Sequence, residues 1–436
     1  MNYTPHTPED IERALKVIGV DSVEDLFSDI PAELLDPEIE LNDGIDEVTL
    51  MNHLRDLAAR NEPATPFTGG GVRKHFIPSV TGHLAMQSEF VTSYTPYQPE
   101  VSQGILQATF EYQTMIAELT GLPVSNASMY DDASAAAEAA LLACRQTGRE
   151  RIAVSRGVNP ETRDVIETYL QALDIEVEVI ELDGVTTGPI ELGEDVAGLL
   201  MQQPNHLGYL EDMDAASAAA HAAGAIAIAV VDPLSLGVLK SPGDCGADVA
   251  VGDGQAIGNP LAFGGPTFGF MAVRSDLIRQ LPGRLVGETT DVDGKRAFVL
   301  TLQAREQHIR RSKAKSNICT NHQLMAIMAA INLAALGPQG LKQVAVGTVH
   351  AAHHLAGLLQ EAGKEVLPGR FFAEFVIRTN SDPVELRRRL AERGVLAGVP
   401  IGSEYGFGNA LLLSATELST EQERVALAQM ISEVDK

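Results

Sequence analysis

The sequence predicts an α/β fold built on a large, mostly parallel sheet, and three observations support this. Patterns typical of strands and helices alternate from about residue 151 onward. Residues 225–231 are a continuous apolar run, which is typical of a strand covered on both faces. The 436 residues, 45% of them hydrophobic, can bury a large core and form two or three domains.

The first 65 residues are expected to form a helical arm. Thr7 is a suitable N-cap, Pro8 suits the first helical position, and acidic residues follow in the first turn. This predicts a helix over residues 8–17 that stops at Gly19. Because the apolar faces of this segment are short, we expect an arm and not an independent domain.

A loop with tyrosines and prolines precedes the next helix. Pro96 and Pro99 stiffen the backbone of this loop. Either the loop presents polar groups, or it is a connection with half-buried tyrosines. The helix is expected over residues 102–119, where apolar residues recur at helical spacing. The polar groups of the loop belong to Tyr94, Tyr97, Gln98 and Glu100.

The remaining elements divide into a large domain, residues 66–340, and a small C-terminal α/β domain, residues 341–436. A long helix after Gly337-Pro338 is expected to connect them. Strands are expected at 151–155, 175–182, 196–202 and 225–231 in the large domain, and at 372–378, 395–397 and 410–414 in the small one. Helices are expected at 160–173, 214–223, 383–392 and 420–432.

Charge and composition exclude several classes of partner. The net charge of −27 disfavours a nucleic-acid groove or an anionic membrane surface, because both attract lysine and arginine. The N-terminus has no apolar signal core, and no window approaches the length of a membrane-spanning helix. We therefore expect a cytoplasmic chain. Whether its acidity reflects a high-salt cytoplasm stays open.

Several polar positions carry alternative interpretations. Asp232 closes the buried strand, where a carboxylate can meet a ligand or simply cap a turn. Asp131 and Asp132 open an alanine-rich helix, where they would repel a phosphate and cap the helix themselves. A basic segment, residues 305–315, suggests a charged partner, an internal ion-pair seam or a solvated face. The three cysteines lack metal-ligand spacing and are expected to be reduced core thiols: Cys144, Cys245 and Cys319.

Several long motifs resemble the glycine cleavage system P-protein family. They include Y-T-P-Y-Q-P-E-V-S-Q-G from residue 94, N-A-S-M-Y-D-D-A-S from residue 126, V-D-P-L-S-L-G-V-L-K-S-P-G-D from residue 231, and R-E-Q-H-I-R-R-S-K-A-K-S-N-I-C-T-N from residue 305. The resemblance runs through nearly the whole chain and corresponds to the N-terminal half of that family, called subunit 1 or alpha where the enzyme is split. It implies the fold type I fold of pyridoxal-phosphate enzymes. It also implies decarboxylation of glycine and transfer of the aminomethyl group to the lipoyl arm of the H-protein.

One departure from a complete cofactor site determines which role the resemblance implies. Asp232 stands where the family fold places the aspartate that pairs with the pyridine nitrogen. Gln255 and Ala256 stand where His-Lys is expected, so the Schiff-base lysine is missing and Asp232 is vestigial. The resemblance therefore implies that pyridoxal phosphate is held by a partner, P-protein subunit 2 (beta), in an assembly expected to be α2β2, and that no cofactor or metal is bound here.

On this interpretation the loop side chains Tyr94, Tyr97, Gln98 and Glu100 are candidates for lining a shared site. The basic segment is expected at the subunit interface or above ion pairs. Two alternatives stay open. The chain could be a non-catalytic scaffold of the same complex, or a self-sufficient decarboxylase or aminotransferase that uses Lys240 or Lys295.

Overall fold

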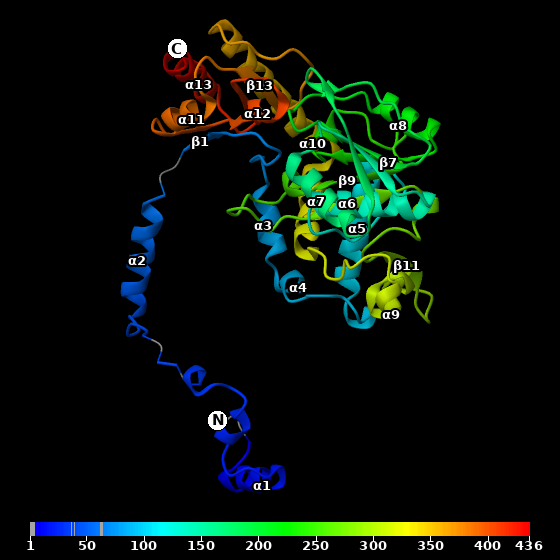
Figure 1. Ribbon diagram of the computed structural model, residues 1–436, viewed down its shortest axis with the longest axis vertical. Helices are drawn as coiled ribbons and strands as arrows, with labels where there is room; N and C mark the ends of the chain where they lie inside the picture. The colour runs from blue at the N-terminus through cyan, green and yellow to red at the C-terminus, as the bar shows by residue number, and fades with distance from the viewer. Residues whose placement is uncertain (1–4, 36, 39, 62–63) are drawn as a thin grey trace. The chain divides into compact units, whose positions relative to one another are not determined.

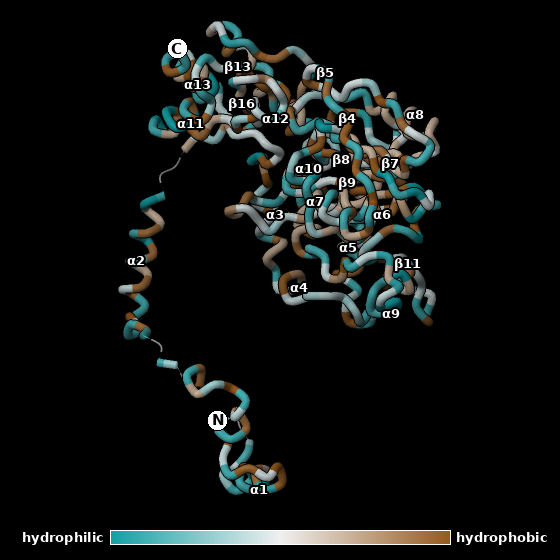
Figure 2. The backbone as a smooth tube through the Cα atoms, viewed as in Figure 1, coloured by the Kyte–Doolittle hydropathy of each residue, from teal (hydrophilic) through white to brown (hydrophobic). Residues whose placement is uncertain are grey.

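A computed structural model describes residues 5–35, 37–38, 40–61 and 64–436 and separates two compact units, Met1–Glu62 and Pro63–Lys436 (Figure 1). The first unit contains α1 (Pro8–Ile18) and α2 (Glu47–Ala59), and no residue of either helix is buried. Thr7 caps α1 and Gly19 ends it in the left-handed region with φ 88°, so the predicted helix is confirmed. Figure 2 shows apolar and polar residues alternating along both helices.

The second unit contains the other elements. Its strands are β1 (Thr65–Phe67), β2 (Val124–Ser125), β3 (Arg151–Ser155), β4 (Glu176–Ile180), β5 (Leu182–Asp183), β6 (Thr186–Thr187), β7 (Val196–Gln203), β8 (Ile226–Val231), β9 (Val249–Asp253), β10 (Gly269–Val273), β11 (Val286–Thr290), β12 (Arg296–Leu300), β13 (Glu374–Arg378), β14 (Val395–Ala397), β15 (Val399–Pro400) and β16 (Ala410–Ser414). Its helices are α3 (Ser79–Ala85), α4 (Ser88–Val91), α5 (Gln103–Thr120), α6 (Asp132–Thr147), α7 (Pro160–Gln171), α8 (Met213–Ala222), α9 (Gln307–Arg310), α10 (Gln323–Glu361), α11 (Pro383–Ala391), α12 (Gly402–Tyr405) and α13 (Glu421–Val434).

The central sheet has the order β2-β10-β9-β8-β7-β3-β4. Strands β4, β3, β7, β8 and β9 are parallel, whereas β10 runs antiparallel to both β9 and β2. Every residue of β8 is buried, as its continuous apolar sequence predicts. The mostly parallel sheet is therefore confirmed.

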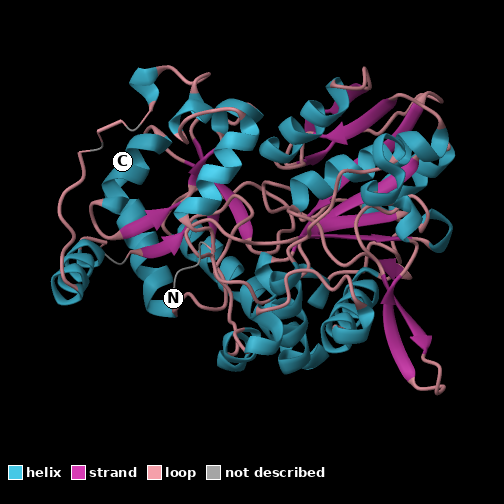
Figure 3. Ribbon diagram, turned by 90° about the horizontal axis from the view of Figure 1, so that it is seen from below, coloured by secondary structure: helices cyan, strands magenta, loops and turns pink. Residues whose placement is uncertain are grey.

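Helices cover both faces of this sheet, as Figure 3 shows. Buried residues of α5, α8 and α10 pack on one face, and those of α6 and α7 pack on the other. The alanine-rich sequence of α6 gives it short side chains, so that its backbone lies close to the strands. This layering leaves the carboxyl edge of the parallel strands open to loops.

A smaller antiparallel sheet, β13-β16-β15, lies beside α11 and α13 in the C-terminal part. Strand β1 pairs in parallel with β14, so residues 65–67 join this C-terminal part although they come from the other end of the sequence. The predicted strands and helices of the segment after residue 372 are all present.

Helix α10 corrects one expectation. It contains an 18-residue window of mean hydropathy 1.5, so by length and composition alone it can span a membrane, contrary to the sequence prediction. Its buried residues belong to the core between α3, α5 and α13, which gives a structural reason for the apolar sequence. Gly337, with φ 62° and ψ 179°, breaks the helix before Pro338, so helix lies on both sides of the break and not only after it.

Candidate functional site

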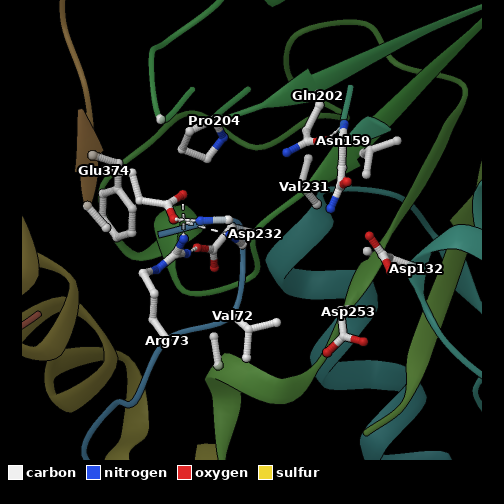
Figure 4. A pocket seen from close by; sticks show the side chains of 18 of the residues that line it. Val72, Arg73, Asp132, Asn159, Gln202, Pro204, Val231, Asp232, Asp253 and Glu374 are labelled. Carbon is white, nitrogen blue, oxygen red and sulfur yellow. Dashed lines mark hydrogen bonds and ion pairs between the residues drawn. The ribbon is translucent and has the colours of Figure 1, made fainter. Parts of the chain in front are cut away.

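A cavity of about 210 Å³ lies beyond the carboxyl ends of the central strands. Asp232 follows β8, Asp253 ends β9 and Gln202 lies near the end of β7. Asp132, from the start of α6, also belongs to the polar lining, as Figure 4 shows. Ligands of open α/β sheets bind at this edge, so the position of Asp232 matches the expectation from its sequence context.

A buried ion triad forms one side of this cavity (Figure 4). The Arg73 guanidinium pairs with Asp232 and with Glu374, whose Oε2 lies 2.7 Å from Nη1. Burial alone would lower the pKa of Arg73, but the charges of Glu374 and Asp232 outweigh it and raise that pKa. Asp232 therefore already has a cationic partner within this chain.

Backbone groups complete the triad. The N–H groups of Gly70 and Gly71 donate to Glu374 Oε1 at 2.7 and 3.1 Å. Both glycines have φ near +97°, at 98° and 96°, a region that residues with a Cβ rarely adopt. The Gly-Gly sequence thus lets the segment before α3 turn around the carboxylate. The triad connects this segment, the end of β8 and the start of β13.

Carboxylates occupy the opposite side of the cavity. Burial, reinforced by the charge of Asp131, raises the pKa of Asp132. Burial also raises the pKa of Asp253 to about 7, with the charge of Asp132 contributing. Asp131 caps α6 by accepting from the Ser134 N–H at 2.7 Å, so the predicted acidic cap is confirmed. The N-terminus of α6 is therefore capped by a carboxylate of this chain, at a position where helices of other proteins can bind an anion.

None of the lysines in the described ranges lines this cavity. Gln255 and Ala256 do line it, and the Gln255 N–H donates to Asp253 Oδ1 at 2.7 Å. Lys240 is half exposed, pairs with Asp214 and lines a different cavity. Lys295 lies in the turn between β11 and β12 and is 75% exposed.

The loop before α5 lies at a separate hollow of about 630 Å³ that Tyr94 and Tyr97 line together. These tyrosines are 77% and 57% exposed, more than a half-buried connection would leave them. The Arg284 Nη2 donates to Tyr97 Oη at 3.1 Å, and the guanidinium carbon is 5.2 Å from the ring centre. Gln98 and Glu100 are exposed and do not line the hollow.

The basic segment is mostly solvent-facing. Arg305 is partly buried and donates to the backbone carbonyl of Gly283 at 3.0 Å. Lys315 donates to Gln280 Oε1 at 2.6 Å. Within the described part of the chain, none of its arginines and lysines forms an ion pair with an aspartate or glutamate, so the interpretation as an internal ion-pair seam is wrong. The exposed members are Arg310, Arg311, Lys313 and Lys315.

Comparisons with known proteins agree on one family. The family model described as "Glycine cleavage system P-protein" matches residues 1–431. A relative from Moorella thermoacetica named "Probable glycine dehydrogenase (decarboxylating) subunit 1" is 50% identical, with 98% of each chain covered. A relative of the same name from Geotalea uraniireducens is 49% identical over 98% of this chain and 99% of its own. The chain belongs to the glycine cleavage system P-protein family.

Solved structures support the same family assignment and extend it to the fold. In a crystal structure of glycine decarboxylase (P-protein) of the glycine cleavage system, in inhibitor-bound form, the matching chain shares 54% sequence identity with this one. The TM-score is 0.90, and the match covers 100% of both chains. A sphingosine-1-phosphate lyase, at 13% identity and a TM-score of 0.65, shares the fold alone. An aspartate aminotransferase from Thermus thermophilus, at 17% identity and a TM-score of 0.58, likewise shares the fold alone. The fold type I fold expected from the resemblance is confirmed.

The cavity of this P-protein chain does not fit the cofactor that its fold implies. Pyridoxal phosphate needs a lysine amine for its Schiff base and favourable surroundings for a phosphate dianion. Ala256, which the resemblance places at the lysine position, lines the cavity, and Asp132 and Asp253 add carboxyl groups near the N-terminus of α6. Asp232, which the resemblance places opposite the ring nitrogen, is already paired with Arg73.

Sequence reasoning missed several residues of these sites, among them Arg73, Glu374 and Arg284. Two of them carried a signal. Glu374 is a charged residue at the start of β13, directly before the apolar residues 375–377, and Arg73 lies two residues after the glycine run at residues 69–71. A charged residue in a buried strand needs a partner, but no local pattern indicates which one. Arg284 carried no comparable signal.

Proposed function

We propose that this chain is subunit 1 of a two-chain glycine dehydrogenase (decarboxylating), the P-protein of the glycine cleavage system. Two observations support the proposal. The chain covers 98% of a relative named as subunit 1 at 50% identity. Among the residues that the structure describes, the cavity is lined by no lysine, and the N-terminus of α6 presents carboxyl groups where a self-sufficient enzyme needs room for a phosphate. In the proposed reaction glycine loses its carboxylate as CO2, and the aminomethyl group passes to the lipoyl arm of the H-protein.

The cofactor belongs, in this proposal, to subunit 2. Pyridoxal phosphate supplies the electron sink for glycine decarboxylation when it is bound there. The present chain forms a wall of the shared cleft and orients groups within it. We further propose an α2β2 assembly in the cytoplasm, with the basic segment at the subunit interface, because its exposed cations lack acidic partners within the described chain.

The loop before α5 is the part of this chain that we assign to the shared site. Tyr94 and Tyr97 support the assignment because exposed phenols beside a hollow can reach a second molecule. Gln98 and Glu100 are exposed at the start of the short turn that follows. All four can donate to or accept from substrate, or orient a side chain of subunit 2.

The first experiment reconstitutes the enzyme from separately purified chains. We expect glycine decarboxylation and glycine–bicarbonate exchange only when this chain, subunit 2 and the H-protein are all present. If subunit 2 is fully active without this chain, the result supports the alternative that this chain is a non-catalytic scaffold. Activity of this chain with H-protein alone would support the self-sufficient alternative.

A second experiment tests the cofactor assignment directly. The lone chain is mixed with pyridoxal phosphate, treated with borohydride and analysed by mass spectrometry. We expect no absorption band of a Schiff base and no site-specific modification. A stoichiometric adduct on Lys240 or Lys295 would contradict the proposal.

Substitution Tyr97→Phe tests the loop in the reconstituted enzyme. It removes one hydroxyl, and we expect a loss of about tenfold in kcat/KM for glycine, the size of one charged hydrogen bond. Tyr169→Phe, a hydroxyl on the surface of α7, serves as the matched control with unchanged kinetics. Unchanged exchange by the Tyr97 variant, with normal assembly, would remove Tyr97 from the site.

A further inference from the structure

Arg284 is a buried cation without an acidic partner. Arg284 is only 3% exposed, and its side-chain partners among the described residues are the neutral groups of Asn321 and Tyr97. The guanidinium donates to Asn321 Oδ1 at 3.2 Å and to Tyr97 Oη at 3.1 Å, while Nε has no hydrogen-bond partner. Burying a charge costs free energy unless other groups compensate for it, so this arrangement calls for a reason beyond packing.

The donor capacity of the two side chains fixes the direction of their hydrogen bond. Arginine has five N–H donors and no acceptor, and it stays protonated. The Tyr97 oxygen must therefore accept from Arg284, which leaves the phenol's own hydrogen free. Tyr97 as a whole is 57% exposed, so this hydrogen is available to an acceptor outside the chain.

Asn321 holds the guanidinium in turn. Its Nδ2 donates to the carbonyl of Ala127 at 2.9 Å and to Ser128 Oγ at 2.6 Å. Asn321 is 6% exposed and precedes α10, and Ala127 and Ser128 lie between β2 and α6. The network therefore connects Tyr97 to two elements of the rigid core, which restricts the phenol to one direction.

We propose that Arg284 is a positioning residue that makes Tyr97 an outward hydrogen-bond donor to a carboxylate oxygen. A cation that donates to the phenol oxygen polarises the O–H bond and favours a negatively charged acceptor. The carboxylate belongs either to the glycine substrate or to a side chain of subunit 2. The inference rests on the proposed function, in which this loop faces the shared site.

A double-mutant cycle in the reconstituted two-chain enzyme tests the inference. The variants are Tyr97→Phe, Arg284→Met and the double variant, and the measured quantities are KM for glycine, kcat and the Kd between the subunits. Each single change is expected to weaken the same quantity by about tenfold. In the double variant this quantity is expected to be impaired no more than about twofold beyond the more impaired single variant, because both changes remove the same hydrogen bond.

The two sources of the carboxylate give different results. A substrate carboxylate predicts that KM for glycine rises while the subunit Kd stays constant. A carboxylate of subunit 2 predicts that the subunit Kd rises instead. Arg284→Lys keeps the charge but cannot make both bonds in the same geometry, so its effect should fall between those of wild type and Arg284→Met.

A control separates positioning from general loss of structure. Arg296 also stacks on an aromatic ring, with its guanidinium carbon 4.8 Å from the Phe298 ring centre, but lies in the β12 strand and is exposed. Arg296→Met should leave all three quantities unchanged. Multiplicative effects of the Tyr97 and Arg284 changes, or an Arg284→Met effect limited to thermal stability, would overturn the inference. In both cases the proposed function still holds if wild-type chain and subunit 2 together decarboxylate glycine. If the wild-type chains together are inactive, the proposed function itself is contradicted.

Discussion

At the scale of single residues, Arg73 determines the chemistry of the cavity. Two carboxylates share this one buried guanidinium, so its removal leaves both without a counter-charge. We expect Arg73→Met to lower the free energy of unfolding by about 3–5 kcal/mol. Urea denaturation measures the change. Arg388→Met, which removes an exposed helix ion pair with Glu385, should leave the free energy of unfolding nearly unchanged in the same assay. Equal costs for the two variants would contradict a special role for Arg73.

Asp253 predicts a pH dependence with a definite sign. Its pKa is raised from 3.8 to about 7 by burial, so the folded chain keeps a proton that the unfolded chain releases near pH 4. Stability is therefore lost as pH rises from about 4 to about 7. Asp253→Asn removes this loss, and its thermal midpoint relative to wild type should be higher at pH 8 than at pH 5.

The stability difference between Asp253→Asn and wild type should change with pH by a measurable amount. We expect a relative gain on the order of 2 kcal/mol between the two pH values, smaller than the full shift implies because the cavity is partly solvated. Asp293→Asn makes the same substitution at an exposed carboxylate and serves as the control for the change itself. A constant offset for Asp253→Asn at both values would mean that its carboxyl is ionised throughout.

At the scale of elements, the end of the chain ties two helices together. Asp435, 1% exposed after α13, accepts from Lys364 Nζ at 2.7 Å, just beyond α10, and from the N–H of Ser381 at 2.8 Å. We expect Asp435→Ala to destabilise the chain by about 3 kcal/mol, since it leaves a buried ammonium unpaired. The paired variant Lys364→Met with Asp435→Leu should recover part of that loss. Equal instability of the single and double variants would contradict the pairing argument.

Elements were the most predictable level of this structure. Strand β8 and helices α5 and α7 follow from apolar runs, helical spacing and a proline at the helix start, all of which are local signals. The break of α10 at Gly337 was visible as Gly-Pro, but its helical first half was not, because alanine-rich core helices lack an amphipathic pattern.

The candidate sites were less predictable for a physical reason. Asp232 was identifiable because it follows a recognisable strand. Its partners Arg73 and Glu374 lie far from it in sequence, and tertiary packing alone brings the three together. Arg284 and Tyr97 are separated in the same way. Local patterns indicate that a charge is out of place, but not which distant group compensates for it.

At the scale of the whole molecule, the two compact units differ in how much they bury. The hydrophobic cores contain no residue from the described part of Met1–Glu62. We therefore expect a chain beginning at Pro63 to unfold with a midpoint within about 2 °C of the full chain, because a core-free segment adds little cooperative stability. Differential scanning calorimetry measures both midpoints. A decrease of about 10 °C would show that residues 1–62 stabilise the second unit.

The ion triad also bears on how the chain can change over evolutionary time. A lysine placed at position 256 would enter a cavity in which Asp232 is already paired with Arg73 and in which the far side offers a phosphate the carboxyl groups of Asp132 and Asp253. Replacing Arg73 alone would leave two buried acids unpaired. Each single substitution is thus unfavourable before the others are made. Building a cofactor site in this cavity therefore needs several substitutions at once.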